Sequence, residues 1–381
     1  MDLRARLARL DRRGAGGGPV AAAPAGAPRR VDLRPGDRDT GRVWLRRHAS
    51  AEPAAPRRVE VLNRVTTHPA PAGLGAEDLL FLDTETTGLA GGTGTLPFLV
   101  GLGWWRRGAF HVTQYFLPSP TAERAMLAEL VRIAGGFKAV VTFNGQTFDL
   151  PLLRTRGILA RRRHLLDDLA SWDLLPVSRR FWGRRLPDCR QQTVESRIAG
   201  LRRSAGDIDG ALIPHAYFAF VRQGRVGALR AVLEHNRRDM VGMAAILGEA
   251  LERAHLLDAT EPPSDLPWQD AWSLARLCES SRDRAREAAW MARAEARARR
   301  TEPPRAFFVD AVRILKRTGD WPRISRLLER ARRAHGPDPW FHLESAMLYE
   351  HRLPDLTRAL DHARELGEPR RIARLVGLLG A

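Results

Sequence analysis

One short apolar run, Leu79-Leu80-Phe81-Leu82, most constrains the fold because it ends directly in the acidic residue Asp83. A compact apolar run of this length is typical of a strand that is buried on both faces. The same criteria predict three further strands and two helices, namely strands at residues 98–105, 110–117 and 139–143, and helices at residues 121–134 and 147–155. The order of three strands, a helix, a strand and a helix predicts an α/β sheet whose first three strands pair antiparallel.

Composition divides the chain into four regions. Residues 1–76 are basic and expected to be largely flexible, residues 77–256 carry the α/β pattern, residues 257–267 form a proline-rich linker, and residues 268–381 are predicted to be all-helical.

The first two regions hold weaker local signals. In the N-terminal region, a basic amphipathic helix is predicted at residues 1–13, low complexity at 14–30, and marginal strands at 43–45 and 59–62. In the second region, two more helices are predicted at 214–223 and 226–251.

The C-terminal region contains a weak internal repeat. Residues 275–294 align without gaps with residues 346–365, and the offset of 71 residues is twice about 35. A period near 34 residues with small residues at the packing positions resembles tetratricopeptide repeats. An ordinary helical bundle is the alternative, and either architecture supplies stacked helices without chemistry.

The charge of the chain is unevenly placed. The sequence has 62 Lys and Arg residues against 44 Asp and Glu residues, a net charge of +18. Residues 1–70 carry +8, residues 71–150 carry −2, and residues 151–205 carry +8. A metal-binding acidic site beside a bound phosphate polymer would produce this pattern, although two solvated basic surfaces would produce it too.

Several protein classes are excluded by simple features. The longest apolar run, residues 96–105, has about half of the roughly 20 residues that a membrane helix needs. The charged N-terminus lacks the apolar core of a signal peptide, and the two cysteines, Cys189 and Cys278, are too far apart in sequence for a zinc motif. We therefore expect a soluble cytoplasmic protein.

Three acidic motifs carry the chemical signal. Asp83 and Glu85 are two residues apart at a strand end, so their side chains lie on the same face. Two adjacent carboxylates repel each other unless a cation such as Mg²⁺ or Mn²⁺ neutralises them. Asp149 follows an Asn-Gly turn at a predicted helix start, and His235 and Asp239 share one face of a helix. Taken singly, each motif has an ordinary explanation: a polar strand end, a helix-start acid favoured by the dipole, or a surface His–Asp pair.

Taken together, the motifs resemble the DEDD exonuclease superfamily of the ribonuclease H-like fold. Its members carry Asp-x-Glu on a strand, Asn-x₂₋₃-Phe/Tyr-Asp, and a last helix with an Asp preceded by His or Tyr. The resemblance spans about residues 78–250. The segments LAGGTGTLPFLVGLG, NGQTFDLP and SRRFW, with the helical repeats, resemble a narrower group, the bacterial YprB-type ribonuclease H-like proteins with tetratricopeptide repeats.

The resemblance implies a mixed sheet flanked by helices and two-metal-ion hydrolysis of phosphodiester bonds, with 3′→5′ exonuclease polarity. It assigns the catalytic and metal-binding roles to Asp83, Glu85, Asp149 and Asp239, with Asp83 bridging two ions of Mg²⁺ or Mn²⁺. His235 would accept the proton of the attacking water. Three residues separate His235 from Asp239, which is the spacing of the Tyr subgroup, so His235 stands where that subgroup has its tyrosine.

The expected partner is DNA or RNA with a single-stranded 3′ end. The candidate contacts are residues of the acidic motifs and of the arginine-rich segment, namely Thr86, Gly88, Asn144, Arg179, Arg180, Trp182, Arg184 and Arg185. The glycine-rich loop that follows the first acids is equally well explained as a tight turn, and burial is favoured over base stacking for Trp182.

Two other functions remain open. A non-catalytic nucleic-acid-binding scaffold would use the helical repeats to dock a protein partner. An endonuclease of the same fold would cut without needing an end. No motif distinguishes DNA from RNA.

Overall fold

The computed structural model describes residues 34–35, 44–50, 52–56, 59–66, 68–88, 93–162, 165–203, 206–259, 263 and 265–380. Contacts divide the chain into two compact units, Met1–His255 and Leu256–Ala381, and each is described by itself. No helix among the described residues is long and apolar enough to cross a membrane. The helix expected at residues 1–13 lies outside the described residues.

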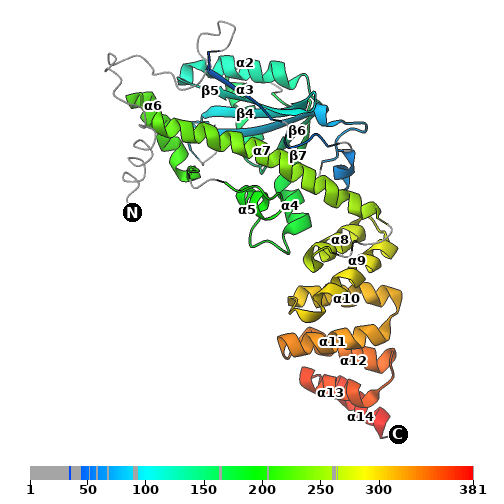
Figure 1. Cartoon of the computed structure of the whole chain (residues 1–381). Coiled ribbons are helices and arrows are strands. Elements are labelled where there is room, and N and C mark those ends of the chain that lie inside the picture. The colour runs from blue at the N-terminus through cyan, green and yellow to red at the C-terminus, as the bar shows by residue number, and fades with distance from the viewer. Residues whose placement is uncertain are drawn as a thin grey trace. The chain divides into compact units, whose positions relative to one another are not determined.

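The first unit is built on a mixed seven-stranded sheet with the order β1-β2-β5-β4-β3-β6-β7 (Figure 1). The strands are β1 (Arg34–Pro35), β2 (Trp44–Ser50), β3 (Leu79–Thr86), β4 (Pro97–Arg106), β5 (Ala109–Phe116), β6 (Ala139–Thr142) and β7 (Ala170–Asp173). Strands β3, β4 and β5 pair antiparallel, as the sequence predicted. Strands β6 and β7 then add in parallel beside β3.

Six α-helices flank this sheet: α2 (Glu123–Ala134), α3 (Asp149–Leu159), α4 (Leu174–Trp182), α5 (Gln191–Arg197), α6 (Ile213–Gln223) and α7 (Gly227–His255). The long helix α7 crosses one face of the sheet and contacts β3, β4 and β5. Helices α2 and α3 lie on the opposite side (Figure 1). Short 3-10 helices connect these elements at Glu60–Arg64, Ala76–Asp78, Pro120–Ala122 and Gly210–Leu212.

The central strand β3 is apolar because both faces of the sheet are covered. Phe81 is fully buried and packs edge-to-face on Trp105 and Phe110. Leu80 and Leu82 point to the other face, where they join the largest apolar cluster of the unit. Covering both faces of β3 buries its whole apolar run, and the polar residues of the strand, two acids and two threonines, lie at its end.

One local prediction is wrong: the marginal strand expected at 59–62 is absent, because Glu60–Arg64 forms a 3-10 helix whose Leu62 is fully buried. The strand expected at 43–45 is confirmed for its described residues as part of β2, and the helix expected at 147–155 is confirmed as α3, which begins at Asp149. Strand β7 and helix α4 were not anticipated, because they lie in the arginine-rich segment.

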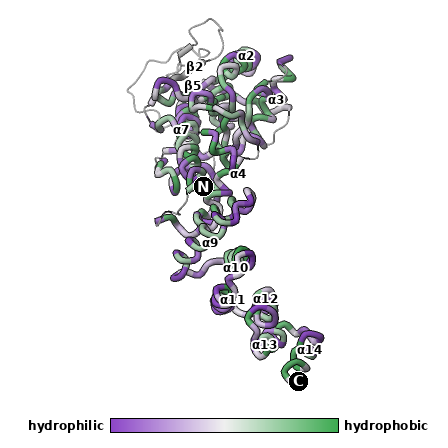
Figure 2. The backbone as a smooth tube through the Cα atoms, turned by 90° about the vertical axis from the view of Figure 1, so that its right-hand side faces the viewer, coloured by the Kyte–Doolittle hydropathy of each residue, from purple (hydrophilic) through white to green (hydrophobic). Residues whose placement is uncertain are grey.

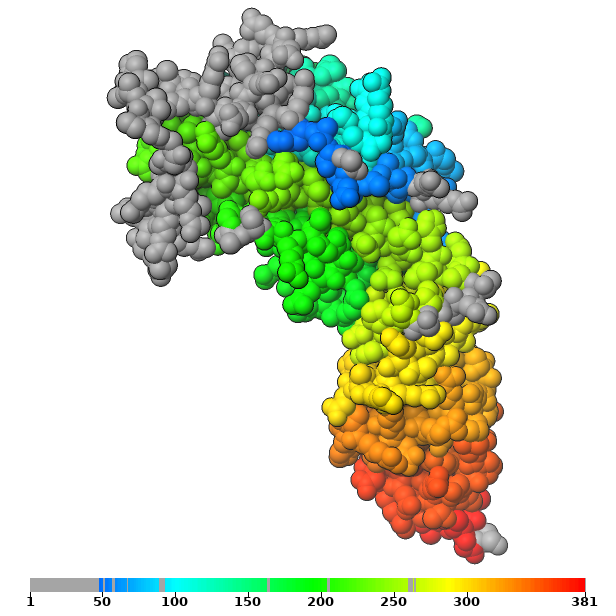
Figure 3. Space-filling view, viewed as in Figure 1, coloured from blue at the N-terminus to red at the C-terminus, as the bar shows by residue number. Residues whose placement is uncertain are grey.

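The second unit is a series of paired helices, preceded by the 3-10 helix Leu256–Asp258. The helices are α8 (Trp268–Ser280), α9 (Arg284–Arg297), α10 (Arg305–Thr318), α11 (Trp321–His335), α12 (Pro339–His351), α13 (Leu356–Leu366) and α14 (Pro369–Leu379), with a 3-10 turn at Ala298–Arg300. Successive pairs follow one another in chain order along this unit, from yellow to red (Figure 3). Hydrophilic and hydrophobic stretches alternate along the tube here (Figure 2), as expected of helices with one buried face.

The second helix of each pair begins in the same way. Asp283, Asp320 and Asp355 are N-caps of α9, α11 and α13, and each accepts the backbone N–H of an arginine three residues on. The first helices of the pairs start at Trp268, Arg305 and Pro339, which are 37 and 34 residues apart. This shared Asp-x-x-Arg cap supports the repeat period that the sequence indicated.

Candidate metal-dependent active site

The first two acids lie at the end of β3. Asp83 pairs with Gly101 and Glu85 with Leu99 across the antiparallel ladder to β4. Residues two apart on a strand share a face, so both carboxylates point to the face that α7 covers. Glu85 is only 9% exposed, and its carboxylate makes no hydrogen bond or ion pair with any of the described residues.

The third acid, Asp149, is the first residue of α3. Its Oδ1 accepts a hydrogen bond of 2.5 Å from the hydroxyl of Thr84, which lies between the first two acids. The preceding turn is held by Asp173, the last residue of β7. Asp173 accepts the backbone N–H groups of Asn144 at 2.7 Å and Gln146 at 3.2 Å, and it also caps α4.

The last acid and the histidine come from α7. The ligand atoms of His235, Asp239 and Glu85 all lie within 4.8 Å of one another. His235 Nε2 is 3.2 Å from Asp239 Oδ2, which is the expected contact for residues four apart on a helix. Between them, Asn236 is fully buried and donates from Nδ2 to Asp83 Oδ2 at 2.7 Å. Helix α7 thus connects directly to the acids of β3.

The electrostatics of the cluster favour a bound cation. Burial, with Asp239 and Asp149 nearby, raises the pKa of Asp83 well above its usual value. Burial and the carboxylate of Asp83 raise the pKa of Glu85 in the same way. Burial also raises the pKa of Asp149 to about 6 and that of Asp239 above its ordinary value. Four buried carboxylates repel one another when they are ionised, so a nearby positive charge is needed to stabilise their ionised form.

The residues fit a hard divalent cation. Carboxylate oxygens are the ligands that Mg²⁺ and Mn²⁺ prefer, and the unpaired, buried carboxylate of Glu85 is where such an ion would replace a missing partner. Asp83, Glu85, Asp149 and Asp239 would hold it, with His235 beside them. Of the five residues that the sequence selected, the structure brings Glu85, His235 and Asp239 together, with Asp83 close to both Asp149 and Asp239.

Sequence reasoning missed several polar residues that support the cluster. Asn236 lies inside the His235–Asp239 motif and could have been found as a buried amide in a helix. Asp173 ends a short strand of which only Trp172 is large and apolar. Sequence reasoning also missed Arg203, which contacts Asp239, and the two other acids that Arg203 binds, Glu195 and Asp207. Asp207 Oδ1 lies 2.9 Å from His235 Nδ1.

The expected nucleic-acid contacts are in different environments. Thr86 donates its hydroxyl to the carbonyl of Gly88 at 2.8 Å, and no atom of the described residues lies within 4 Å of a Cβ placed at Gly88. Arg179 is exposed at the end of α4, whereas Arg180 bonds the carbonyl of Val65. Arg184 and Arg185 are partly buried.

Trp182 requires a correction. Its indole is 0% exposed and packs against Phe181 at a centroid distance of 5.7 Å. A base cannot reach it, so Trp182 is a core residue.

Comparison with known proteins agrees with this geometry. A family model described as the RNase_H superfamily matches residues 80–251, which include all five clustered residues. A relative described as "Uncharacterized protein YprB", from Bacillus subtilis (strain 168), is 35% identical over 175 residues, covering 46% of this chain and 42% of the relative. The chain thus spans less than half the length of the curated relative that it matches. Residues 80–251 form a domain of the RNase H superfamily.

Proposed function

We propose that residues 77–256 are a metal-dependent nuclease that hydrolyses nucleic-acid phosphodiester bonds as a 3′→5′ exonuclease. The observation that carries this proposal is the convergence of Glu85, His235 and Asp239 beside Asp83 and Asp149, from one strand and two helices. Two Mg²⁺ or Mn²⁺ ions held by these acids would activate the water and stabilise the leaving oxygen.

Each residue of the cluster has a proposed role in metal binding, proton transfer or the orientation of the acids. Asp83 lies near Glu85, Asp149 and Asp239, so these four acids together would hold the ions. Asp207 faces Nδ1 of His235, so a proton held at Nδ1 leaves Nε2 as the nitrogen that accepts a proton from water. Thr84 and Asn236 orient Asp149 and Asp83 through hydrogen bonds.

The test is cleavage of end-labelled DNA and RNA, single- and double-stranded, with Mn²⁺ and with Mg²⁺. The wild-type protein should release mononucleotides from a free 3′ end. Asp83→Asn, which keeps the shape and removes the charge, should lower the rate by about a hundredfold or more. Asp78→Asn is the matched control, because Asp78 pairs with Lys138 outside the cluster.

Three outcomes would contradict the proposal in different ways. Cleavage that survives Asp83→Asn would remove the cluster from the reaction. Cleavage of a circular single strand would show an endonuclease. Binding without cleavage in both Mg²⁺ and Mn²⁺ would favour the scaffold that uses its helical repeats to dock a protein.

A further inference from the structure

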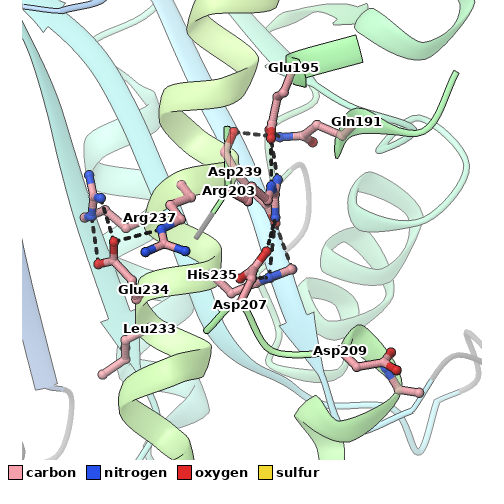
Figure 4. A network of polar contacts seen from close by, with 12 residues as sticks. Gln191, Glu195, Arg203, Asp207, Asp209, Leu233, Glu234, His235, Arg237 and Asp239 are labelled. Atoms are coloured by element: carbon pink, nitrogen blue, oxygen red, sulfur yellow. Dashed lines mark hydrogen bonds and ion pairs between the residues drawn. The ribbon is translucent and has the colours of Figure 1, made fainter. Parts of the chain in front are cut away.

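Arg203 places a fixed positive charge against the acidic cluster. Its guanidinium binds Glu195 bidentately, with Nε to Oε2 at 2.7 Å and Nη2 to Oε1 at 2.8 Å. Nη1 donates to Asp207 at 3.0 Å, and Nη2 also donates to Asp239 Oδ1. Figure 4 shows the guanidinium lying between these three carboxylates. One of them, Asp239, belongs to the candidate metal site.

The position of Arg203 is set by groups outside that metal site. Glu195 is 2% exposed and is itself held by Gln191, whose amide donates to Glu195 Oε1 at 2.9 Å and to the Asp239 carbonyl at 2.8 Å. Gly242 of α7 makes room for Glu195, since a Cβ there would overlap its carboxylate. A bidentate ion pair in such a packed setting holds the guanidinium in one orientation.

A fixed guanidinium on Asp239 has a direct consequence for cation binding. Arginine stays charged at any working pH, so it repels a divalent cation that approaches the same carboxylate. It also occupies Asp239 Oδ1, one of the two oxygens that this residue can offer. Conversely, without a metal it supplies a counter-charge to an otherwise repulsive cluster.

We propose that Arg203 is an internal counter-cation that competes with divalent cations for Asp239. It keeps the acids together in the metal-free protein, and it holds the metal affinity of the site below what the four acids alone would give. This inference rests on the proposed metal site.

The test is the affinity of the full chain for Mn²⁺ and Mg²⁺, measured by calorimetry at one pH and without nucleic acid. Arg203→Gln should bind Mn²⁺ roughly tenfold or more tightly, because a positive charge beside the ion is removed. The metal-free variant should also melt at a lower temperature than the wild type. Arg203→Lys keeps the charge and should stay close to the wild-type affinity.

Two further variants keep the result interpretable. Arg237→Gln is the control, because Arg237 pairs with Glu234 on α7 at 2.7 Å and contacts none of the acids of the cluster; its affinity should not change. Arg203→Gln with Glu195→Gln also removes the buried charge that Arg203 pairs with at Glu195, so it should fold even if the single variant does not. It should still bind Mn²⁺ more tightly than the wild type.

The outcomes separate this inference from the proposed function. Affinity that is unchanged or weaker in both Arg203→Gln and the double variant would overturn the counter-cation, because a purely structural Arg203 would only weaken the site. A wild-type chain that binds neither ion, with Asp83→Asn indistinguishable from it, would instead overturn the metal site itself.

Discussion

Asn236 donates a 2.7 Å hydrogen bond to Asp83, a residue 153 positions earlier in the chain. The side-chain oxygen of Asn236 accepts from Gln114 at 2.9 Å, and Gln114 also donates to the carbonyl of Leu233. A Cβ at Gly101 would overlap this amide, so the absence of a side chain there lets α7 approach β4. A series of buried hydrogen bonds from Gln114 through Asn236 to Asp83 therefore aligns α7 with the acids of the sheet.

We expect Asn236→Ala to destabilise the first unit by about 1–3 kcal/mol. The substitution leaves one buried oxygen of Asp83 without its donor and removes one of the two acceptors of the Gln114 amide. Urea denaturation measures this change in the free energy of unfolding. Arg238→Gln on the same helix removes only a partly exposed pair with Glu234 and should cost less than about 1 kcal/mol. Equal losses in both variants would contradict a special role for the amide.

The same polar contacts mark the limit of what the sequence could predict. The acids of β3 and their partners on α3 and α7 were found because an apolar strand, an Asn-Gly turn and a helical spacing are local patterns. Glu195, Arg203 and Asp207 lie in or just beyond a segment with thirteen basic residues, where no local pattern separates a buried arginine from an exposed one. Only the packing of α5 on α7 makes that distinction.

Burial also decides two local questions that the sequence raised. Trp182 was a candidate base contact for which burial was favoured over stacking, and α4 turns its apolar side, including Phe181 and Trp182, into the core. Leu62 was placed in a strand because its neighbours are apolar, although the surrounding residues close a 3-10 turn instead. In both cases the hydrophobic residues were recognised, and the structure that buries them depended on distant contacts.

Gly242→Ala and Gly248→Ala form a matched pair on α7. An alanine at Gly242 overlaps the buried Glu195 carboxylate and should cost about 1–3 kcal/mol, as overpacking does. An alanine at Gly248 meets nothing within 4 Å and should stabilise the helix by up to about 1 kcal/mol. Thermal or urea unfolding measures both. If the two variants have the same stability, Glu195 is not fixed where the structure places it.

Glu85→Gln should have opposite effects with and without metal. The metal-free variant should be at least as stable as the wild type. Burial and the neighbouring acids disfavour the ionised form of Glu85, and the substitution replaces this carboxylate by a neutral amide. A divalent cation at 100 times its dissociation constant should stabilise the wild type by about 2.7 kcal/mol and the variant far less. Melting curves with and without Mn²⁺ measure this. Glu129→Gln, at a partly exposed residue that pairs with Arg132 on α2, should retain the full metal effect.

Phe148 is an exposed aromatic residue directly before Asp149. Its side chain is 55% exposed, so it offers a face on which a terminal base can stack. Phe148→Ala should weaken oligonucleotide binding by about tenfold, as loss of one stacking contact does, and leave folding unaffected. Fluorescence anisotropy measures the affinity. Ile158→Ala, at the other end of α3 and 63% exposed, is the control and should bind normally.

His362 should make the second unit sensitive to mild acid. Burial, together with the guanidinium of Arg332, lowers the pKa of His362 to about 4. The unfolded chain binds this proton near pH 6.5, so the stabilisation is complete above that pH and is lost as the pH falls towards 4. We expect a loss of about 1 kcal/mol across this window, since solvent partly screens the side chain. Hydrogen exchange of α12 and α13 at pH 5 and pH 7.5 measures it, and His362→Gln should flatten the dependence. An identical pH dependence in the variant would assign the sensitivity to other groups.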